Sequence, residues 1–173
     1  MTKYLYKKIL KYFLYFLFIF LLFVLQSVPG LLDYCSVSPI LVLPACICIA
    51  VYEGELPGGI MGFFAGILCD SASETVFGFN AFFYLVLCVT ASLVVIYLLR
   101  KSTLNIMLIS LAAILVRSFM EYFFKFQIYG YESAPVVFFQ SFGPQIAYSA
   151  IFVLPFCLII RYVHERFEPE SQQ

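Results

Sequence analysis

Long apolar runs separated by short polar breaks are the feature that most constrains how this chain can fold. A helix needs about 20 apolar residues to cross the hydrocarbon region of a bilayer, and it satisfies its own backbone hydrogen bonds without water. Six segments fit this requirement, although unequally. They cover approximately residues 9–28, 36–52, 56–70, 79–99, 104–124 and 144–161. We therefore predict an all-α integral membrane protein with six transmembrane helices in one polytopic domain, residues 1–173.

The composition excludes an ordinary soluble domain. Hydrophobic residues make up 64% of the 173 residues and charged residues only 12%, whereas soluble domains are about 45–50% apolar and about 25% charged. The excess apolar surface must face lipid. The 10 basic and 10 acidic residues cancel, so the net charge favours neither a nucleic acid nor an acidic substrate.

Lys and Arg are unevenly distributed over the six-span arrangement. With the N-terminus inside, eight of them lie on the inner side: Lys3, Lys7, Lys8, Lys11, Arg100, Lys101, Arg161 and Arg166. Only Lys125 lies outside, and Arg117 falls within the fifth span. Because cytoplasmic loops carry the excess of basic residues, this distribution predicts that both termini are cytoplasmic. A five-span chain would bury Glu53 and Glu55 in mid-membrane, which is costly.

The third span is short and rich in glycine. Gly58, Gly62 and Gly66 recur every four residues, a spacing that lets two helix backbones approach closely. We favour packing inside the bundle, because polytopic proteins use such stripes mostly in that way. The alternative is a groove for a partner's span.

Asp70 continues the glycine series at the outer end of the third span. The following residues resemble an external loop, in which Gly78 permits a positive φ and Asn80 is placed to cap the fourth helix. We favour a structural role for Asp70, in which it holds the loop through hydrogen bonds to backbone N–H groups. A functional polar site is the alternative.

Two further charged features lie in the second half of the chain. Arg117 and Glu121 are one helical turn apart in the fifth span, so we expect them to form an intramembrane ion pair. His164, the only histidine, is expected to be solvated in the cytoplasmic tail. A proton-relay site would show more ionisable groups converging on the middle of the membrane.

Local breaks in the spans come mainly from proline. Pro44 and Pro155 lie inside predicted spans and should bend them. Gly143-Pro144 begins the last span, and the apolar stretch from Pro135 to Phe142 before it is either interfacial or re-entrant.

Motifs for enzymatic chemistry are absent from the sequence. There is no phosphate-binding loop, no His-Glu-x-x-His, no Gly-x-Ser-x-Gly and no Cys-x-x-Cys. Most of the six cysteines lie in apolar runs and are expected to pack as small hydrophobic residues, while a bridge between Cys35 and Cys69 is left open. We therefore predict neither catalysis nor a bound cofactor or metal.

Several short motifs occur in a fixed order between residues 20 and 100. They are Leu25-Gln26-Ser27, Ser38-Pro39-Ile-Leu-Val-Leu, Glu53-Gly54, Gly58-x-x-x-Gly62-Phe63-x-x-Gly66-x-x-x-Asp70 and Gly78-Phe79-Asn80-Ala81-Phe82. In this order and spacing, with the length and the Lys-rich start, they resemble the MreD family of bacterial rod shape-determining membrane proteins. The last two spans match that family only in hydropathy and in the basic tail.

The resemblance implies a non-enzymatic scaffold subunit of the elongasome, the machine that directs lateral peptidoglycan synthesis. It implies a multi-pass protein of the bacterial cytoplasmic (inner) membrane that binds an MreC-like single-span protein and supports rod shape. The actin-like MreB, the polymerase RodA and a class B penicillin-binding protein are the further partners that it implies.

The MreD family is also similar in fold to the substrate-binding S components of ECF transporters, which have six helices. That similarity implies an alternative function, the binding of a vitamin or other small molecule for uptake. Such a site needs polar and aromatic groups that converge on one pocket. The expected outer side offers scattered polar residues: Asp33, Asp70, Glu74, Asn80, Lys125 and Glu132.

Overall fold

The computed structural model describes residues 2–28, 39–72, 77–99, 101–129 and 143–167. Within these ranges the chain forms six helices joined by short connections, and the all-α prediction is confirmed there. The helices are α1 (Thr2–Ser27), α2 (Val42–Glu53), α3 (Glu55–Ala72), α4 (Phe79–Tyr97), α5 (Thr103–Tyr129) and α7 (Gly143–Phe167).

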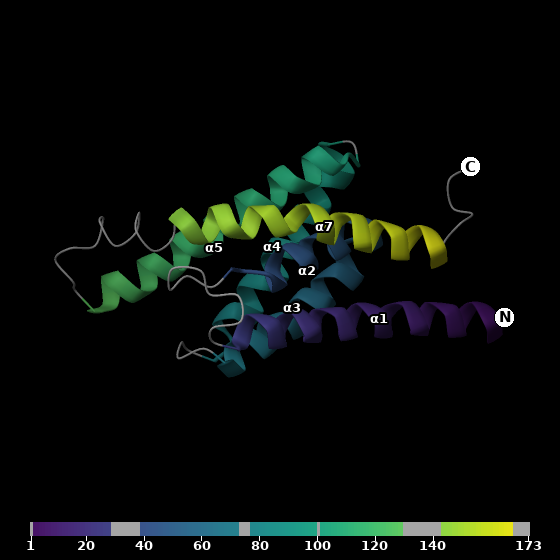
Figure 1. Ribbon diagram of the computed structural model, residues 1–173, viewed down its shortest axis with the longest axis horizontal. Helices are drawn as coiled ribbons and strands as arrows, with labels where there is room; N and C mark the ends of the chain where they lie inside the picture. Colours follow the sequence, from purple (N-terminus) through teal and green to yellow (C-terminus); the bar gives the residue numbers. More distant parts are fainter. Residues whose placement is uncertain (1, 29–38, 73–76, 100, 130–142, 168–173) are drawn as a thin grey trace.

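The first and last helices lie side by side and run in opposite directions, so both ends of the chain are at one end of the molecule (Figure 1). The rings of Phe18 and Phe156 meet edge to face, with centroids 5.8 Å apart. Farther toward the termini, Nζ of Lys11 lies 3.4 Å from Nδ1 of His164. We call this end of the bundle the terminal end and the opposite end the distal end.

Helix α2 is the innermost helix, and it is shorter than the second predicted span. It contacts α1, α3, α4, α5 and α7, and all ten residues from Val42 to Val51 are buried. Its 12 residues rise about 18 Å, against a hydrocarbon thickness of about 30 Å. Residues 39–41 are not helical, so the prediction of a helix over 36–52 placed its start too early.

Pro44 accounts in part for where α2 begins. It lies in the first turn of α2, where an N–H group has no partner within the helix and its loss costs nothing. The expectation that Pro44 bends a span was therefore wrong. At the other end, Gly54 adopts a φ of +95° and connects α2 to α3 in a single residue.

The glycine stripe of α3 lies against neighbouring helices of the same chain. A Cβ on Gly58 would come within 2.3 Å of the Ala50 Cα on α2, and a Cβ on Gly66 within 2.3 Å of the Ala81 Cα on α4. A Cβ on Gly62 would lie 2.9 Å from the carbonyl oxygen of Tyr84, also on α4. These approaches leave a partner's helix no space at the three glycines.

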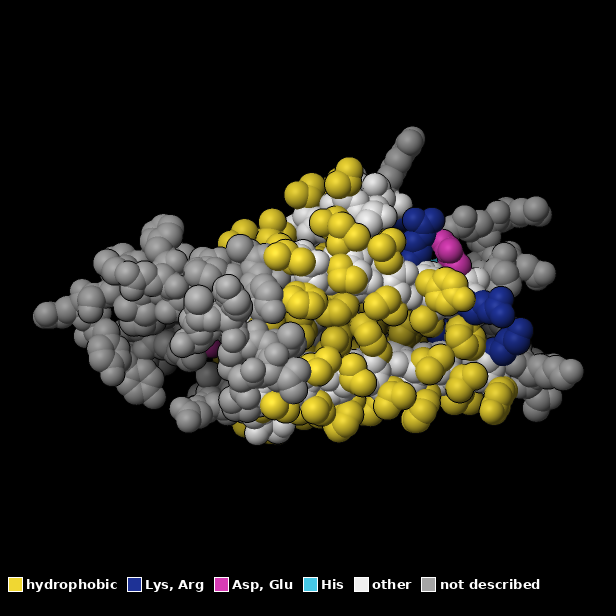
Figure 2. Space-filling model, viewed as in Figure 1, with side chains coloured by type: hydrophobic (Ala, Val, Ile, Leu, Met, Phe, Trp, Pro, Cys, Tyr) yellow, Lys and Arg dark blue, Asp and Glu magenta, His cyan; other side chains and the backbone are white. Residues whose placement is uncertain are grey.

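Three of the described helices contain a stretch that is long and apolar enough to cross a membrane. These stretches are Tyr6–Ser27, Phe79–Tyr97 and Thr103–Phe124, whereas α2 is a shorter apolar helix. Exposed hydrophobic side chains cover the middle of the molecule in Figure 2. Soluble monomers rarely expose an apolar surface of this extent, so the surface fits a lipid environment.

Helices α1, α5 and α7 extend well beyond the predicted spans, and α1 already begins at Thr2 instead of near residue 9. α5 continues past residue 124 to Tyr129, and α7 continues past residue 161 to Phe167. His164 and Arg166 therefore lie in a helix, not in a tail. The stretch from Pro135 to Phe142 and Cys35 lie outside the described residues, and Cys69 is a buried free thiol.

Candidate functional site at the two ends of the bundle

Buried and partly buried polar and charged side chains form two clusters, one near each end of α3. The Asp70 cluster, at the distal end, comprises Asp70, Asn80, Tyr84, Arg117 and Glu121. The Glu53 cluster, at the terminal end, comprises Lys11, Tyr15, Glu53 and His164. The helical rise from Glu55 to Asp70 separates the two clusters by about 22 Å.

Asp70 caps the N-terminus of α4 from the end of α3. One carboxylate oxygen, Oδ2, accepts hydrogen bonds from the backbone N–H groups of Gly78 and Ala81, each at 3.0 Å. The other, Oδ1, accepts from the backbone and the side-chain amide of Asn80, also at 3.0 Å. The carboxylate, only 3% exposed, thus satisfies N–H groups that lack partners within α4 and faces the positive end of its dipole.

The capping residue of α4 differs from the prediction. Gly78 occupies the N-cap position with a φ of +96°. Since glycine has no side chain, the N-cap residue itself provides no capping hydrogen bond. Asn80 lies inside the first turn, so the expectation that it caps the fourth helix was wrong. A left-handed backbone at the N-cap excludes Ser, Thr and Asn in their usual geometry, and the cap comes from Asp70 on the preceding helix.

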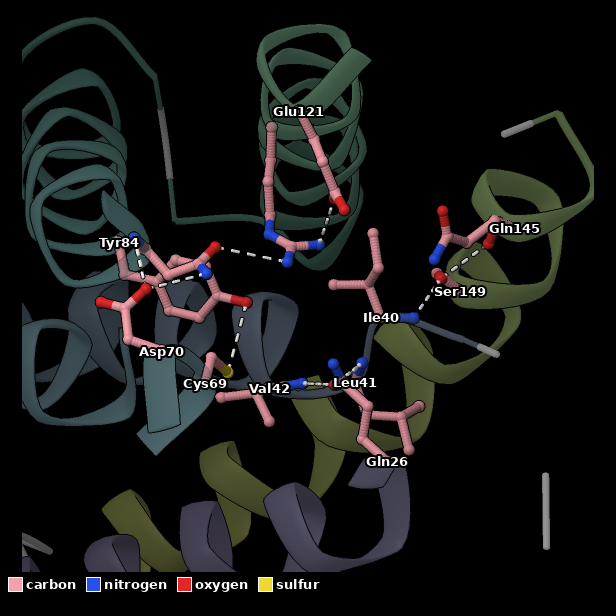
Figure 3. A network of polar contacts seen from close by, with 12 residues as sticks. Gln26, Ile40, Leu41, Val42, Cys69, Asp70, Tyr84, Glu121, Gln145 and Ser149 are labelled. Carbon is pink, nitrogen blue, oxygen red and sulfur yellow. Dashed lines mark hydrogen bonds and ion pairs between the residues drawn. The ribbon is translucent and has the colours of Figure 1, made fainter. Parts of the chain in front are cut away.

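Arg117 on α5 faces the same cluster. Its Nη2 donates a hydrogen bond to Oδ1 of Asn80 at 3.4 Å, and its Nη1 lies 3.7 Å from Oε2 of Glu121. The guanidinium also lies over the ring of Tyr84, 5.7 Å from its centroid. Figure 3 shows Tyr84, Asp70 and Glu121 converging from three helices on this end of the bundle. The arrangement joins α3, α4 and α5 through polar contacts.

The chain enters α2 through buried backbone that is bonded to side chains. The N–H group of Ile40 donates to Oγ of Ser149 on α7 at 2.8 Å. The N–H groups of Leu41 and Val42 both donate to Oε1 of Gln26 at the end of α1, at 2.9 and 3.3 Å (Figure 3). An unpaired N–H group inside a membrane costs several kcal/mol, so Gln26 and Ser149 replace the missing water.

One carboxylate oxygen organises the Glu53 cluster. Oε1 of Glu53, at the end of α2, lies 2.6 Å from Nζ of Lys11 and accepts hydrogen bonds from Tyr15 at 3.0 Å and His164 at 2.8 Å. The Lys11 and Glu53 side chains are 2% and 3% exposed. Three helices, α1, α2 and α7, are therefore joined at a single atom.

The Glu53 cluster was not predicted from the sequence. His164 was expected to be solvated, but it is 20% exposed, bonds to Glu53 and stacks obliquely near Tyr52, with ring centroids 5.6 Å apart. Lys11 was counted only among the basic residues of the cytoplasmic side, and no buried partner was predicted for it. A cationic residue one turn inside an apolar run was the signal available, because such a residue needs a buried counter-charge.

Neither cluster is arranged for metal binding. Among the described residues, no group of three or more His, Cys, Asp or Glu side chains is placed to hold a metal ion. The carboxylate of Asp70 is directed at four N–H donors and that of Glu53 at Lys11, Tyr15 and His164. The polar side chains of both clusters join neighbouring helices to one another.

A model of one protein family matches the chain. It is described as rod shape-determining protein MreD, and it matches residues 6–166. No curated protein and no solved structure matches the chain. The matched range contains both clusters and reaches all six described helices.

Proposed function

Since the chain belongs to the MreD family of rod shape-determining membrane proteins, we propose that it is a non-enzymatic scaffold subunit of the elongasome. In this role it binds an MreC-like single-span protein in the bacterial inner membrane and supports lateral peptidoglycan synthesis. MreB, RodA and a class B penicillin-binding protein are the further members of the assembly that we propose. Its immediate environment is the lipid bilayer, and no nucleic acid takes part.

The observation that carries the scaffold proposal is the use of the buried charged groups. Asp70 and Glu53 are each 3% exposed and bonded across helices, so both contribute to holding the bundle. A catalyst or a proton relay needs a titratable group that faces substrate or water. The two carboxylates in this bundle instead face donors of their own chain.

We further propose that the terminal end faces the cytoplasm. The exposed basic residues of α1 and α7, Lys7, Lys8, Arg161 and Arg166, lie there, and Figure 2 shows Lys and Arg side chains gathered at the end where the termini lie. The excess of basic residues on the cytoplasmic side supports this orientation.

Co-purification tests the partner. Tagged protein extracted in mild detergent is expected to recover an MreC-like single-span protein in a fixed ratio. Gly66→Leu, which forces α3 from α4, should lose the partner, whereas Phe64→Leu, at a side chain 49% exposed, should retain it. Recovery of an ECF energy-coupling subunit with no MreC-like protein would overturn the scaffold proposal.

Thiol labelling tests the orientation. The five described cysteines are buried, so a Cys35→Ser background allows a single new cysteine to be followed. A cysteine introduced by Lys101→Cys is expected to react with a membrane-impermeant reagent only after cells are opened. Labelling of intact cells at this position would contradict cytoplasmic termini.

A further inference from the structure

Two exposed lysines stand at the terminal end of α1, one turn before the buried Lys11. Lys7 and Lys8 are both exposed, and neither forms an ion pair within the described part of the chain. Two acidic side chains at this end of the bundle bind other basic residues: Glu53 binds Lys11 at 2.6 Å, and Glu165 binds Arg161 at 2.8 Å. Among the described residues, no acidic side chain neutralises Lys7 or Lys8, so their positive charge can attract an anion.

A third basic residue comes from the neighbouring helix. In the antiparallel pairing of α1 with α7, Lys11 lies beside His164 and Phe18 near Phe156. If the same pairing continues toward the termini, Arg166 lies level with Lys8 and Ile9 of α1. Arg166 is exposed, and a guanidinium binds two phosphate oxygens at once.

A row of exposed leucines, the leucine stripe, follows Lys7 along α1 in the direction of the distal end. Leu10, Leu14, Leu17 and Leu21 follow Lys7 at alternating intervals of three and four residues and so share one face of α1. They are 38%, 37%, 50% and 53% exposed. From Leu10 to Leu21 the helix rises about 16 Å, close to the thickness of one bilayer leaflet at about 15 Å.

We propose that the terminal end of α1, together with Arg166 of α7, binds an anionic phospholipid. The phosphate lies against Lys7 and Lys8, and an acyl chain extends along the leucine stripe. A zwitterionic lipid offers the same chains but no net negative charge, so charge sets the preference. This proposal rests on the membrane location of the family and is independent of the protein partner proposed above.

Binding of phosphatidylglycerol to the purified protein tests this site, measured by native mass spectrometry and by thermal unfolding in phosphatidylcholine nanodiscs with and without phosphatidylglycerol. We expect tighter binding and a higher unfolding temperature with the anionic lipid. Because each basic residue near a charged surface contributes about a factor of five to affinity, Lys7→Gln/Lys8→Gln should weaken binding about twenty-five-fold. The matched control Arg100→Gln/Lys101→Gln removes the same charge from the connection between α4 and α5 and should change binding little.

Several outcomes would overturn the proposal. Equal unfolding temperatures of the wild-type protein in the two lipid mixtures would exclude a preference for anionic lipid. An equal loss in both double variants would indicate general attraction to a charged surface. Equal stabilisation by free glycerol 3-phosphate would indicate a site for a soluble anion, and displacement of the lipid by a single-span protein would assign the stripe to a partner helix.

Discussion

The two ends of the bundle bury a carboxylate in different ways. At the distal end, Asp70 is compensated by three backbone N–H groups and one amide of the following loop and helix. At the terminal end, Glu53 is compensated by the charge of Lys11. The first arrangement is local in sequence and uses backbone dipoles. The second joins residues more than forty positions apart, and it requires two charges to be buried together.

This difference predicts which end tolerates simultaneous substitution of both members of the pair. A buried ion pair can often be replaced by uncharged residues of similar volume, whereas removal of one partner leaves an unpaired charge. The Asp70 cap consists mainly of backbone donors, so it has no second charged side chain to remove. The Glu53 end should therefore be rescued by a second substitution, and the Asp70 end should not.

Asp70→Asn is expected to have the largest effect. The amide nitrogen of Asn carries hydrogens where one oxygen of Asp70 accepted two hydrogen bonds, so two N–H donors at the start of α4 lose their acceptor. At about 1–3 kcal/mol for each unsatisfied group, we expect a loss of about 4 kcal/mol. Thermal unfolding in mild detergent measures it, and Arg117→Met in the same chain should not restore the loss. Restoration would show that charge balance, not backbone capping, is the role of Asp70.

Glu53→Gln is expected to cost about 3 kcal/mol, because it leaves the Lys11 ammonium buried without a counter-charge. Adding Lys11→Met should recover most of that loss in the same unfolding measurement. If the double variant is as unstable as Glu53→Gln alone, the Lys11 charge is not what Glu53 compensates, and the proposed difference between the two ends disappears.

Gly66→Ala tests the packing that positions Asp70. The new Cβ would lie 2.3 Å from the Ala81 Cα, and because backbone must move, we expect a cost of about 2 kcal/mol. Ile60→Ala, at a side chain 55% exposed on the same helix, removes atoms without forcing α3 from α4 and should cost clearly less. An equal effect of both substitutions would remove the packing argument.

Gln26→Leu is expected to cost about 2 kcal/mol, the lower end of about 1–3 kcal/mol for each unsatisfied group, because the N–H groups of Leu41 and Val42 lose a shared acceptor that is only part-buried. Ser149→Ala affects one N–H group, that of Ile40, and should cost about 1 kcal/mol. Hydrogen exchange at these amides measures the effect directly, since protection should fall at residues 41–42 in the first variant and at residue 40 in the second. Uniform loss of protection would point to global unfolding.

The smallest effect is expected at Arg161. Its ion pair with Glu165 has side chains 52% and 60% exposed, and such pairs contribute little in water. Arg161→Gln should unfold at the wild-type temperature within error. A clear loss of stability would show that the terminal end depends on a wider charge network than Lys11 and Glu53.

The parts of the fold that were predictable from sequence are those governed by local rules. Apolar runs predict helices, and glycines at four-residue intervals predict close approach, so α3 and its stripe were recognised. The Asp70 contacts were also within reach, because the residues concerned are only eight to eleven positions apart. The assignment of the N-cap to Asn80 failed because capping across two helices leaves no local pattern.

The contacts that escaped prediction are those between distant segments. Lys11 and His164 are separated by 153 positions, and Ile40 and Ser149 by 109. The residues around His164, Ile40 and Ser149 do not indicate which partner each would meet, and the position of Lys11 inside an apolar run indicated only that it needs a counter-charge. The short length of α2 was missed for a related reason, since an apolar run does not show whether it faces lipid or other helices.

The buried position of α2 has a consequence for how the protein is made. Synthesis delivers α1 and α2 to the membrane before α7. The N–H group of Ile40, which leads into α2, nevertheless donates to Ser149 of α7, and Oε1 of Glu53 contacts His164 of α7 as well as Lys11. Only the arrival of the last helix completes the first half of the molecule.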